Sequence, residues 1–570
     1  MNVRSPEDLE KLRRELLAGR KHKQVIAVCG GTGCVAFGTQ KVVEALKEEI
    51  KKHGVKEKVE IRETGCLGLC ELGPMLIIHP DEIPYFRVKP EDASEIISKT
   101  IMKKELIERL LYRDPITGEA VSKGEEFPFY KYQLRLLLEN NAKIDPRKIE
   151  DYVAIGGYSA LAKVLFHMTP EQVLEEVKNS NLRGRGGGGF PTGRKWETCR
   201  NASGTPKYAL VNCSEGDPAA FKDRALMEAN PHALLEGLII GMYAIGAREG
   251  FVYVRNEYPL AVEHMELAIR QAERGGFLGE DVMGSGLSFR VEVHKGAGMF
   301  VSGESTALMS AIEGKIGEPR SKYIHTAVSG LYGKPTNLNN VETWMNVPLI
   351  ISKGAEWFKS IGTESSKGTK VFSLVGKVNN VGLVEVPMGT TLRDVVYKIG
   401  GGVKNGKRLK AVQIGGPGGG FITEEMLNIP VDFDEMFKAG TSMVLGSVVV
   451  LDEDTCMVDL TRYFQEFLTE ESCGKCIPCR EGLRVLHKIL TDICNGNGRE
   501  KDIEMIQDIT ETMVEASLCA LGTNATNPVL TSIQYFKDEW EQHIREKHCP
   551  AKVCKSLVNY ETSSKTEERD

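Results

Sequence analysis

The chain has 570 residues, and at about 150 residues per domain this length suggests about four folded units. Hydrophobic residues make up 41% and charged residues 27%, a balance that excludes bulk disorder. The 73 Lys and Arg residues are outnumbered by 79 Asp and Glu residues, so the charge favours neither a nucleic acid nor an anionic membrane as partner.

The chain also lacks sequence signals for a membrane or for export. No apolar run approaches the roughly 20 residues of a membrane-spanning helix. The N-terminus alternates charge with leucine and lacks the apolar centre of a signal peptide. We therefore expect a soluble, cytoplasmic protein whose 14 cysteines are reduced and available as metal ligands.

The order of the expected elements predicts an α/β multidomain protein. Residues 1–105 begin with a surface helix and continue as a small α/β unit whose cysteines lie on loops after strands. Residues 106–147 are mixed and charged, and we expect a linker that crosses a neighbouring surface. The following units are a large glycine-rich α/β domain at 148–367, a compact β-containing domain at 368–440, a helical bundle at 441–546 and a tail at 547–570.

Two cysteine pairs in the first unit have the spacing of iron–sulfur ligands. Four residues separate Cys29 from Cys34, and three separate Cys66 from Cys70. Each pair can hold one iron of a [2Fe–2S] cluster, and the neighbouring glycines let the backbone approach the inorganic sulfide. Structural zinc is the alternative, but zinc sites usually favour two-residue spacings.

A second cysteine group lies in the helical bundle. Cys473, Cys476 and Cys479 are each separated by two residues, and Cys519 is the available remote fourth ligand. Three closely spaced thiolates and one distant thiolate are the usual ligands of a [4Fe–4S] cluster. A zinc knuckle or a redox-active CxxC pair is the alternative.

A glycine-rich loop at 184–189 precedes Lys195. Its G-x-G-x-x-G pattern does not follow an apolar strand, so a dinucleotide fingerprint is not indicated, and Arg194 stands where a P-loop would have lysine. Exposed backbone N–H groups followed by a cation suit a phosphate-bearing ligand such as a flavin nucleotide.

Five sequence blocks resemble the NADH-binding flavoprotein subunit of respiratory complex I. They are RGRGGGGFPTGRKW, NCSEGDPAAFKDR, GAGMFVSGESTALMSAIEG, GKPTNLNNVET and ESCGKCIPCREG. The preceding cysteine unit resembles the thioredoxin-like [2Fe–2S] domain fused ahead of this subunit in the β subunits of multimeric [FeFe] hydrogenases. The same fusion is found in electron-bifurcating transhydrogenases and in NAD(P)-linked formate dehydrogenases.

The resemblance implies a fold for each unit. It predicts a thioredoxin-like [2Fe–2S] domain at 1–105 and an FMN- and NAD(P)-binding α/β domain at 148–367. It predicts a β-grasp-like soluble-ligand-binding domain at 368–440, followed by a C-terminal helical bundle with the [4Fe–4S] cluster.

The resemblance also implies binding residues in the large domain. Lys195 would neutralise the flavin phosphate, while Asn339 and Asn340 would bind ribityl and phosphate oxygens. Phe190 stands where the family stacks an aromatic ring on the nicotinamide, and Lys322 where it places a cation near the dinucleotide. The implied FMN residues are Gly184, Gly186, Lys195, Asn212, Glu215, Gly303, Glu304, Asn339, Asn340 and Thr343. No acid–base side chain is expected for hydride transfer.

Three positions depart from the family pattern and bear on the nucleotide. Ser214 replaces an aspartate, Ser305 replaces a glutamate near the adenosine ribose, and His325 replaces an aromatic residue. The missing glutamate would have repelled a 2′-phosphate, so Ser305 favours NADP(H), with Arg320 or Lys322 available to pair with the phosphate. The alternative is that Ser305 only relaxes the selectivity for NAD(H).

The C-terminal segment contains a further set of metal-binding residue types. His543, Cys549 and Cys554 lie close together in the sequence, and Cys456 precedes the helical bundle. Together they predict a Cys3His zinc site that ties the tail to the body. The alternative is a pair of reduced surface cysteines beside solvated histidines.

The sequence as a whole predicts a diaphorase subunit of an electron-bifurcating oxidoreductase, with FMN linking two-electron hydride transfer with NAD(P)(H) to one-electron clusters. The implied partners are a small thioredoxin-like [2Fe–2S] subunit and a larger hydrogenase, formate dehydrogenase or transhydrogenase subunit, with ferredoxin as a further carrier. The alternatives are a subunit of a non-bifurcating NADH dehydrogenase and a flavin-free electron-transfer scaffold.

Overall fold

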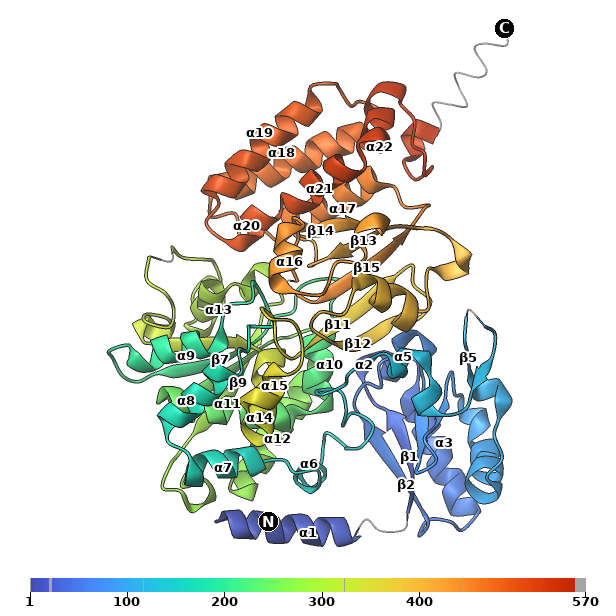
Figure 1. The fold of residues 1–570 in the computed structure, drawn as a ribbon, viewed down its shortest axis with the longest axis vertical. Helices are drawn as coiled ribbons and strands as arrows, with labels where there is room; N and C mark the ends of the chain where they lie inside the picture. Colours follow the sequence, from blue (N-terminus) through green and yellow to red (C-terminus); the bar gives the residue numbers. More distant parts are fainter. Residues whose placement is uncertain (1, 20–22, 116, 322, 444, 559–570) are drawn as a thin grey trace.

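The computed structural model describes residues 2–19, 23–115, 117–321, 323–443 and 445–558. Figure 1 shows a small sheet unit and a large α/β unit side by side, a second sheet unit in the middle, and a group of helices at the end away from α1. This arrangement confirms the predicted α/β multidomain fold with a C-terminal helical region.

The small N-terminal unit is a four-stranded mixed sheet in the order β2-β1-β3-β4. The central strand β1 pairs parallel with β2 and antiparallel with β3, so the ends of β1 and β2 that carry the cysteine loops lie side by side. Helix α3 packs on the sheet through Val42, Val43, Leu46 and Ile50. The elements are β1 (Gln24–Cys29), α2 (Thr32–Ala36), α3 (Thr39–Lys52), β2 (Val59–Thr64), η1 (Cys70–Leu72), β3 (Leu76–His79), β4 (Ile83–Tyr85), η2 (Pro90–Asp92), α4 (Ala93–Glu95) and η3 (Ile96–Ile101).

Helix α1 (Pro6–Gly19) does not pack on this unit, although the sequence places it within residues 1–105. Its apolar stripe, Leu9, Leu12 and Leu16, joins the core of the large α/β unit. The helix contacts α6 (Ile149–Ala154) and α7 (Ser159–His167), as Figure 1 shows. The spacing of the three leucines predicts an apolar face but not which neighbour covers it.

The segment from 106 to 147 joins the two units as a packed strap. Phe127 and Phe129 are fully buried, and they share a core with the strands of the middle sheet. The backbone N–H groups of Leu137 and Leu138 donate to the buried Glu385 carboxylate. Its short elements are η4 (Glu108–Leu110), β5 (Tyr112–Arg113), β6 (Ala120–Val121), η5 (Gly124–Glu126) and α5 (Pro128–Lys131).

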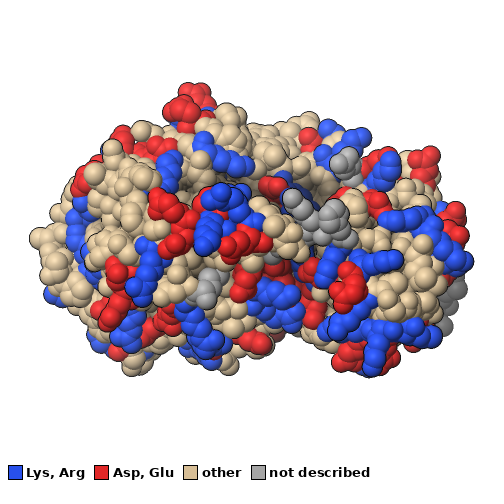
Figure 2. All heavy atoms as spheres, turned by 90° about the horizontal axis from the view of Figure 1, so that it is seen from below, with Lys and Arg blue, Asp and Glu red and all other residues tan. Residues whose placement is uncertain are grey.

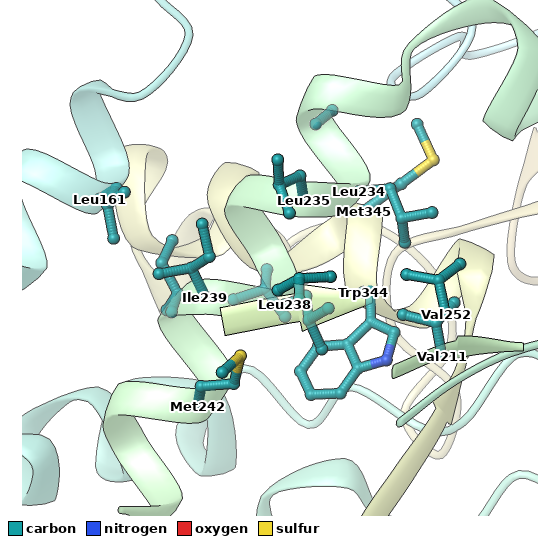
Figure 3. Close-up of a cluster of buried hydrophobic side chains, with 14 of the residues drawn as sticks. Leu161, Val211, Leu234, Leu235, Leu238, Ile239, Met242, Val252, Trp344 and Met345 are labelled. Carbon is teal, nitrogen blue, oxygen red and sulfur yellow. The ribbon is translucent and has the colours of Figure 1, made fainter. Parts of the chain in front are cut away.

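The large unit contains a parallel sheet in the order β10-β7-β8-β9. In Figure 3 the Trp344 ring lies among Val211, Val252 and Leu238, where strands meet helices. The strands are β7 (Tyr208–Cys213), β8 (Glu249–Arg255), β9 (Arg290–Gly296) and β10 (Thr336–Asn340). The further helices are α8 (Pro170–Asn179), α9 (Thr192–Asn201), α10 (Lys222–Ala229), α11 (Pro231–Ile245), α12 (Pro259–Gly275), η6 (Val282–Gly284), η7 (Phe300–Gly303), α13 (Ser305–Ile312), η8 (Leu331–Gly333), α14 (Val341–Lys353) and α15 (Ala355–Lys359).

The middle unit is a five-stranded sheet in the order β12-β11-β15-β13-β14. Its last strand, β15, lies in the centre of the sheet, so the sheet runs past residue 440, where the sequence places the start of the helical bundle. The apolar run of β15 is needed to pair β11 with β13. The elements are β11 (Thr369–Gly376), β12 (Gly382–Pro387), η9 (Asp394–Ile399), η10 (Lys404–Gly406), β13 (Leu409–Ile414), β14 (Gly420–Thr423), η11 (Glu424–Met426), α16 (Phe433–Lys438) and β15 (Ser447–Asp452).

The C-terminal unit is helical. Its core is built from the apolar faces of α17 and α18, with the indole of Trp540 fully buried between helices. No helix in the described ranges combines the length and apolar character needed to cross a bilayer. Acidic and basic side chains are interspersed over the face in Figure 2, in keeping with the small net charge. The helices are α17 (Met457–Glu470), α18 (Ile477–Cys494), α19 (Asp502–Ala516), α20 (Ala520–Asn524), α21 (Asn527–Tyr535), α22 (Lys537–Glu541) and η12 (Gln542–Glu546).

Candidate functional site

The four cysteines of the N-terminal unit come together at one edge of its sheet. Cys29 ends β1, Cys34 lies in α2, and Cys66 and Cys70 follow β2. Neighbouring thiols are within hydrogen-bonding reach, and the Cys66 and Cys70 Sγ atoms are 3.7 Å apart. Hydrogen bonding with Cys29, together with burial, raises the pKa of Cys66 to about 12. A bound cation stabilises thiolates that are this crowded and buried, so the residues fit an iron–sulfur cluster.

The cysteine loops are packed directly against the large unit. The Glu228 carboxylate of α10 accepts hydrogen bonds from the backbone N–H of Thr32 at 3.0 Å and from its hydroxyl. A Cβ atom at Gly65 would lie 2.2 Å from the Cβ of Ala229, so only glycine permits this approach. On the other side, the Leu383 N–H donates to the Gly68 carbonyl at 2.7 Å. The [2Fe–2S] site therefore lies between two other units of the chain.

The glycine-rich loop lies over the carboxyl end of β10 and the start of α14. The Arg185 N–H donates to the Thr343 hydroxyl at 2.9 Å, and a Cβ atom at Gly186 would lie 2.5 Å from the Asn340 Cβ. At Gly187 and Gly188, an added Cβ atom would meet no atom within 4 Å. The loop therefore presents backbone beside open space, at the sheet edge where parallel α/β folds bind ligands.

The other residues of the implied flavin site meet around this edge. Asn212 donates to the Gly303 carbonyl at 2.9 Å, and Asn340 donates to the Asp223 carboxylate at 2.6 Å. The Asn340 side chain also accepts from the Glu342 N–H and so caps α14. The amide of Asn340 thus organises the site through protein contacts.

Lys195 and Ser214 supply polar groups for a ligand. The Lys195 ammonium lies in the first turn of α9, 3.0 Å from the Leu338 carbonyl and beside Asn339. The buried Ser214 hydroxyl has no hydrogen-bond partner in the described part of the chain. A cation, an unpartnered hydroxyl and an open glycine loop fit a phosphorylated flavin.

Glu215 is a buried carboxyl group at the same edge. It accepts hydrogen bonds from the backbone N–H groups of Asp223 and Arg224 at 3.0 and 3.1 Å. Burial, followed by repulsion from the Asp223 carboxylate, raises the pKa of Glu215 to about 7. This group can therefore hold or release a proton near neutral pH.

A buried charge cluster adjoins the flavin site and is absent from the sequence-based prediction. The Lys222 ammonium lies 2.6 Å from Asp223 and 3.0 Å from Glu342, while Lys370 of β11 lies 2.7 Å from Glu342. Lys222, Glu342 and Lys370 are fully buried. The pairing connects the middle sheet to the flavin edge. A lysine directly before the apolar run 371–375 is the one sequence signal, because a buried cation requires a partner.

The residues expected to bind the nucleotide lie on a more exposed rim. The Phe190 ring is 47% exposed and lies 5.9 Å from the His325 ring, centroid to centroid. The Ser305 hydroxyl donates to the Glu304 carboxylate at 3.0 Å, and Glu304 caps α13. The Arg320 guanidinium donates to the Gly330 carbonyl. Lys322 lies outside the described residues.

The four bundle cysteines line one cavity. Cys473, Cys476, Cys479 and Cys519 face it together with Val301 and Pro319 of the large unit. Burial raises the pKa of Cys519, with a smaller contribution from the charge of Glu304. Four thiols around one cavity fit a cubane cluster, and η7 carries Gly303 towards the flavin edge and Val301 towards this cavity.

The tail residues form a compact group of metal-binding atoms. The Cys456 Sγ lies 3.3 Å from His543 Nε2 and 3.8 Å from the Cys554 Sγ, and Cys549 completes a buried set within 4.8 Å. A tetrahedral zinc with Zn–S bonds of about 2.3 Å would separate its sulfurs by about 3.8 Å. The His543 Nδ1 pairs with the Glu539 carbonyl at 2.7 Å, which leaves Nε2 for a metal. Asp459, Cys494 and Cys554 form a second, three-ligand grouping.

Four protein families match successive parts of the chain. The thioredoxin-like [2Fe–2S] ferredoxin family matches residues 18–101, and the Nuo51 FMN-binding domain family matches residues 177–349. The SLBB domain family matches residues 371–421. The NADH-ubiquinone oxidoreductase-F iron–sulfur binding region matches residues 459–543.

Curated relatives cover most of the chain. The NADP-reducing hydrogenase subunit HndC of Solidesulfovibrio fructosivorans is 48% identical over 430 residues, which are 75% of this chain and 87% of that protein. The second F-type subunit of the NADH-quinone oxidoreductase of Rhizobium meliloti is 45% identical over 415 residues, which are 73% of this chain and 99% of that protein. The chain belongs to the family of NADH-quinone oxidoreductase F-type subunits.

A solved structure extends the likeness of this F-type member over nearly its whole length. The NAD+-reducing [NiFe]-hydrogenase in the H2-reduced state matches with a TM-score of 0.64 and 26% identity, over 95% of this chain and 90% of that chain. The family matches confirm FMN, [2Fe–2S] and [4Fe–4S] as the cofactors. The protein is a flavin- and iron–sulfur-containing oxidoreductase subunit of the type present in hydrogenases and complex I-like enzymes.

Proposed function

We propose that this F-type member is the diaphorase module of an electron-bifurcating oxidoreductase complex. One observation supports the proposal: the flavin edge has separate connections to two cluster sites. Helix α10 carries Asp223 at the flavin edge and Glu228 at the [2Fe–2S] loop, while η7 runs from Gly303 to the cubane cavity. A site that sends two electrons to different acceptors requires two such exits.

The residue roles in the flavin site are part of this proposal. The glycine loop and Lys195 would hold the phosphate, and the unpartnered Ser214 hydroxyl would add a hydrogen bond. When bound, FMN accepts a hydride from the nicotinamide and releases electrons one at a time. Glu215, with its pKa near 7, would hold a proton at this edge. The remaining proposed contacts are Gly184, Gly186, Asn212, Gly303, Glu304, Asn339, Asn340 and Thr343.

For the nucleotide we propose NADP(H). The relative HndC is described as NADP-reducing, and Ser305 in this chain presents a hydroxyl where the family has a glutamate. A carboxylate about 4 Å from a 2′-phosphate costs on the order of 4 kcal/mol at an effective dielectric near 20. Ser305→Glu should therefore raise the ratio of kcat/KM for NADH over NADPH, and an unchanged ratio would exclude this residue as the determinant.

The metal assignments follow the geometry of the thiol groups. We assign the [2Fe–2S] cluster to Cys29, Cys34, Cys66 and Cys70, and the [4Fe–4S] cluster to Cys473, Cys476, Cys479 and Cys519. Structural zinc is assigned to Cys456, His543, Cys549 and Cys554, because all four are buried and offer one nitrogen and three sulfurs.

The complex would contain at least two other subunits. A small thioredoxin-like [2Fe–2S] subunit and a larger catalytic subunit fit the proposed role, and the hydrogenase relatives favour hydrogenase chemistry over formate dehydrogenase or transhydrogenase chemistry.

Flavin retention tests the central part of the proposal. The purified chain should release about one FMN on acid treatment and should reduce an artificial dye with NADPH. Lys195→Ala should weaken FMN retention, because the phosphate loses its nearest cation. Arg194→Ala, which removes a neighbouring cation of the same helix, is the matched control. Flavin-free protein that still reduces the dye would overturn the assignment.

A further inference from the structure

The [2Fe–2S] site has an outward side as well as a side packed on the flavin unit. Cys66 and Cys70 lie on the loop that packs against Ala229 and Leu383. Cys34 lies on the opposite loop, only 3% exposed. A Cβ atom at Gly73 would lie 2.7 Å from the Cys34 Sγ and 3.3 Å from the Phe37 ring. A single layer of atoms therefore separates this cluster ligand from the surface.

A groove opens on the surface at this point. Phe37, Pro74 and Pro90 contribute its apolar lining, and the Phe37 ring is 58% exposed. Lys41, Arg87 and Lys89 also line the groove, and all three are exposed. We name this surface, defined by these six residues, the Phe37 groove.

The charge of the Phe37 groove is not neutralised within the chain. Lys41, Arg87 and Lys89 form no ion pair among the described residues, although most lysines and arginines nearby do. The acidic neighbours are engaged elsewhere: Asp92 pairs with Arg109 at 2.7 Å, and Glu71 pairs with Lys404 at 2.7 Å.

Two further acids, Glu44 and Glu91, lie on the same segments but are not among the groove-lining residues. The groove is thus an apolar centre with three cations that form no ion pair within the described ranges, in a chain whose net charge is −6. Such a surface attracts an acidic protein and then packs against its apolar contact area.

We propose that the Phe37 groove is the docking site of a small, acidic, one-electron carrier protein with its own iron–sulfur cluster. One electron passes between the reduced cluster of one protein and the oxidised cluster of the other, and no covalent bond changes. The carrier binds because its acidic rim meets Lys41, Arg87 and Lys89, and because Phe37 brings the two clusters close. The inference rests on the proposed electron transfer from flavin to the [2Fe–2S] cluster.

Charge reversal in the groove tests the proposal. The probe is a small acidic [2Fe–2S] ferredoxin, reduced by the FMN- and cluster-loaded chain with NADPH. The triple variant Lys41→Glu, Arg87→Glu, Lys89→Glu should lower the second-order rate on the order of tenfold or more at low salt, and should remove most of its salt dependence. Phe37→Ala should lower the rate with the salt dependence retained.

A matched control reverses three exposed lysines of the same unit, Lys51, Lys56 and Lys58, at the opposite end of the sheet. This control changes net charge equally and should retain at least half of the wild-type rate. Dye reduction and the [2Fe–2S] EPR spectrum should be unchanged in every variant, which shows that the flavin and cluster are intact.

Each other outcome has a defined meaning. Loss of dye reduction in the wild-type chain would contradict the proposed function, whereas normal dye reduction without ferredoxin reduction would overturn the groove proposal alone. An equal fall in rate in the control variant, or an unaffected triple variant, would also overturn it. If sedimentation shows that the triple variant disrupts a dimer, the occupant is a second copy of the chain and the proposal is wrong.

Discussion

The Glu228 carboxylate accepts hydrogen bonds from both the backbone N–H and the hydroxyl of Thr32, and so joins the flavin unit to the loop between Cys29 and Cys34. Glu228 is only 2% exposed, and its nearest cation is Arg224 at 3.7 Å. A buried negative charge therefore lies against the [2Fe–2S] loop. This charge opposes reduction of the cluster, because reduction adds a second negative charge nearby.

Glu228→Gln should raise the reduction potential of the [2Fe–2S] cluster by on the order of tens of millivolts, as one charge is removed in a partly desolvated region. An EPR-monitored redox titration measures this shift. The control is Glu48→Gln, an exposed glutamate of the same unit, which should leave the potential in place. An unchanged potential in Glu228→Gln would show that this carboxylate does not act on the cluster.

Lys370→Met should destabilise the protein by about 3–5 kcal/mol, because the buried Glu342 loses one of its two cations. Thermal unfolding measures the loss. The double variant Lys370→Met, Glu342→Gln should recover part of it, since the unpaired charge is gone. Lys488→Met removes a pair that is 74% exposed on the lysine side and should change stability by less than about 1 kcal/mol. A loss as small in Lys370→Met would contradict the buried-pair account.

The pH dependence of stability should report Glu215. Its folded pKa is raised to about 7, chiefly by burial, so the carboxyl group costs nothing while protonated and destabilises the fold as pH rises through 7. The groups that face it are Asp223, Lys222, Arg224, Tyr258 and Arg255. Glu215→Gln removes this titration.

Relative to wild type, Glu215→Gln should therefore gain stability between pH 5 and pH 8, by on the order of 3 kcal/mol at most. Unfolding of both flavin-loaded proteins at the two pH values measures the gain. Glu263→Gln, an exposed glutamate of α12, should show no such trend. A stability difference that is independent of pH would mean that Glu215 is already ionised at pH 5.

Zinc should be present at about one ion per chain, as expected for a four-ligand structural site. Cys549→Ala combined with Cys554→Ala should abolish it and lower the midpoint of thermal unfolding, because metal binding contributes to folding. Elemental analysis decides the first point. Cys199→Ala, a buried cysteine outside the cluster, should retain the metal. Retention of zinc in the double variant would place the ion elsewhere.

Local patterns in the sequence predict the cluster sites, because the ligands of each lie on one or two short loops. Cys473, Cys476 and Cys479 are an example, since their spacing alone suggests a cubane. The zinc group is intermediate, because Cys456 comes from a distant segment and no local spacing connects it to the other three ligands.

Contacts between units cannot be predicted in this way. Glu228 occurs in an otherwise apolar stretch of α10, and its partner Thr32 is 196 positions away in the sequence. Lys370 and Glu342 meet across two units, and β15 enters a sheet that the composition ends at residue 440. Such pairings depend on tertiary packing, which spacing and periodicity do not encode.

The most direct test of the account is EPR spectroscopy of the anaerobically purified chain, with about six iron atoms, after reduction with NADPH. Both the [2Fe–2S] and the [4Fe–4S] signals should appear, because the flavin edge is connected to both sites. In Cys66→Ser, only the [2Fe–2S] signal should disappear, while the cubane remains reducible by the nucleotide. If both signals persist in Cys66→Ser, or if the wild-type clusters are reduced by dithionite but by neither NADPH nor NADH, the account is contradicted.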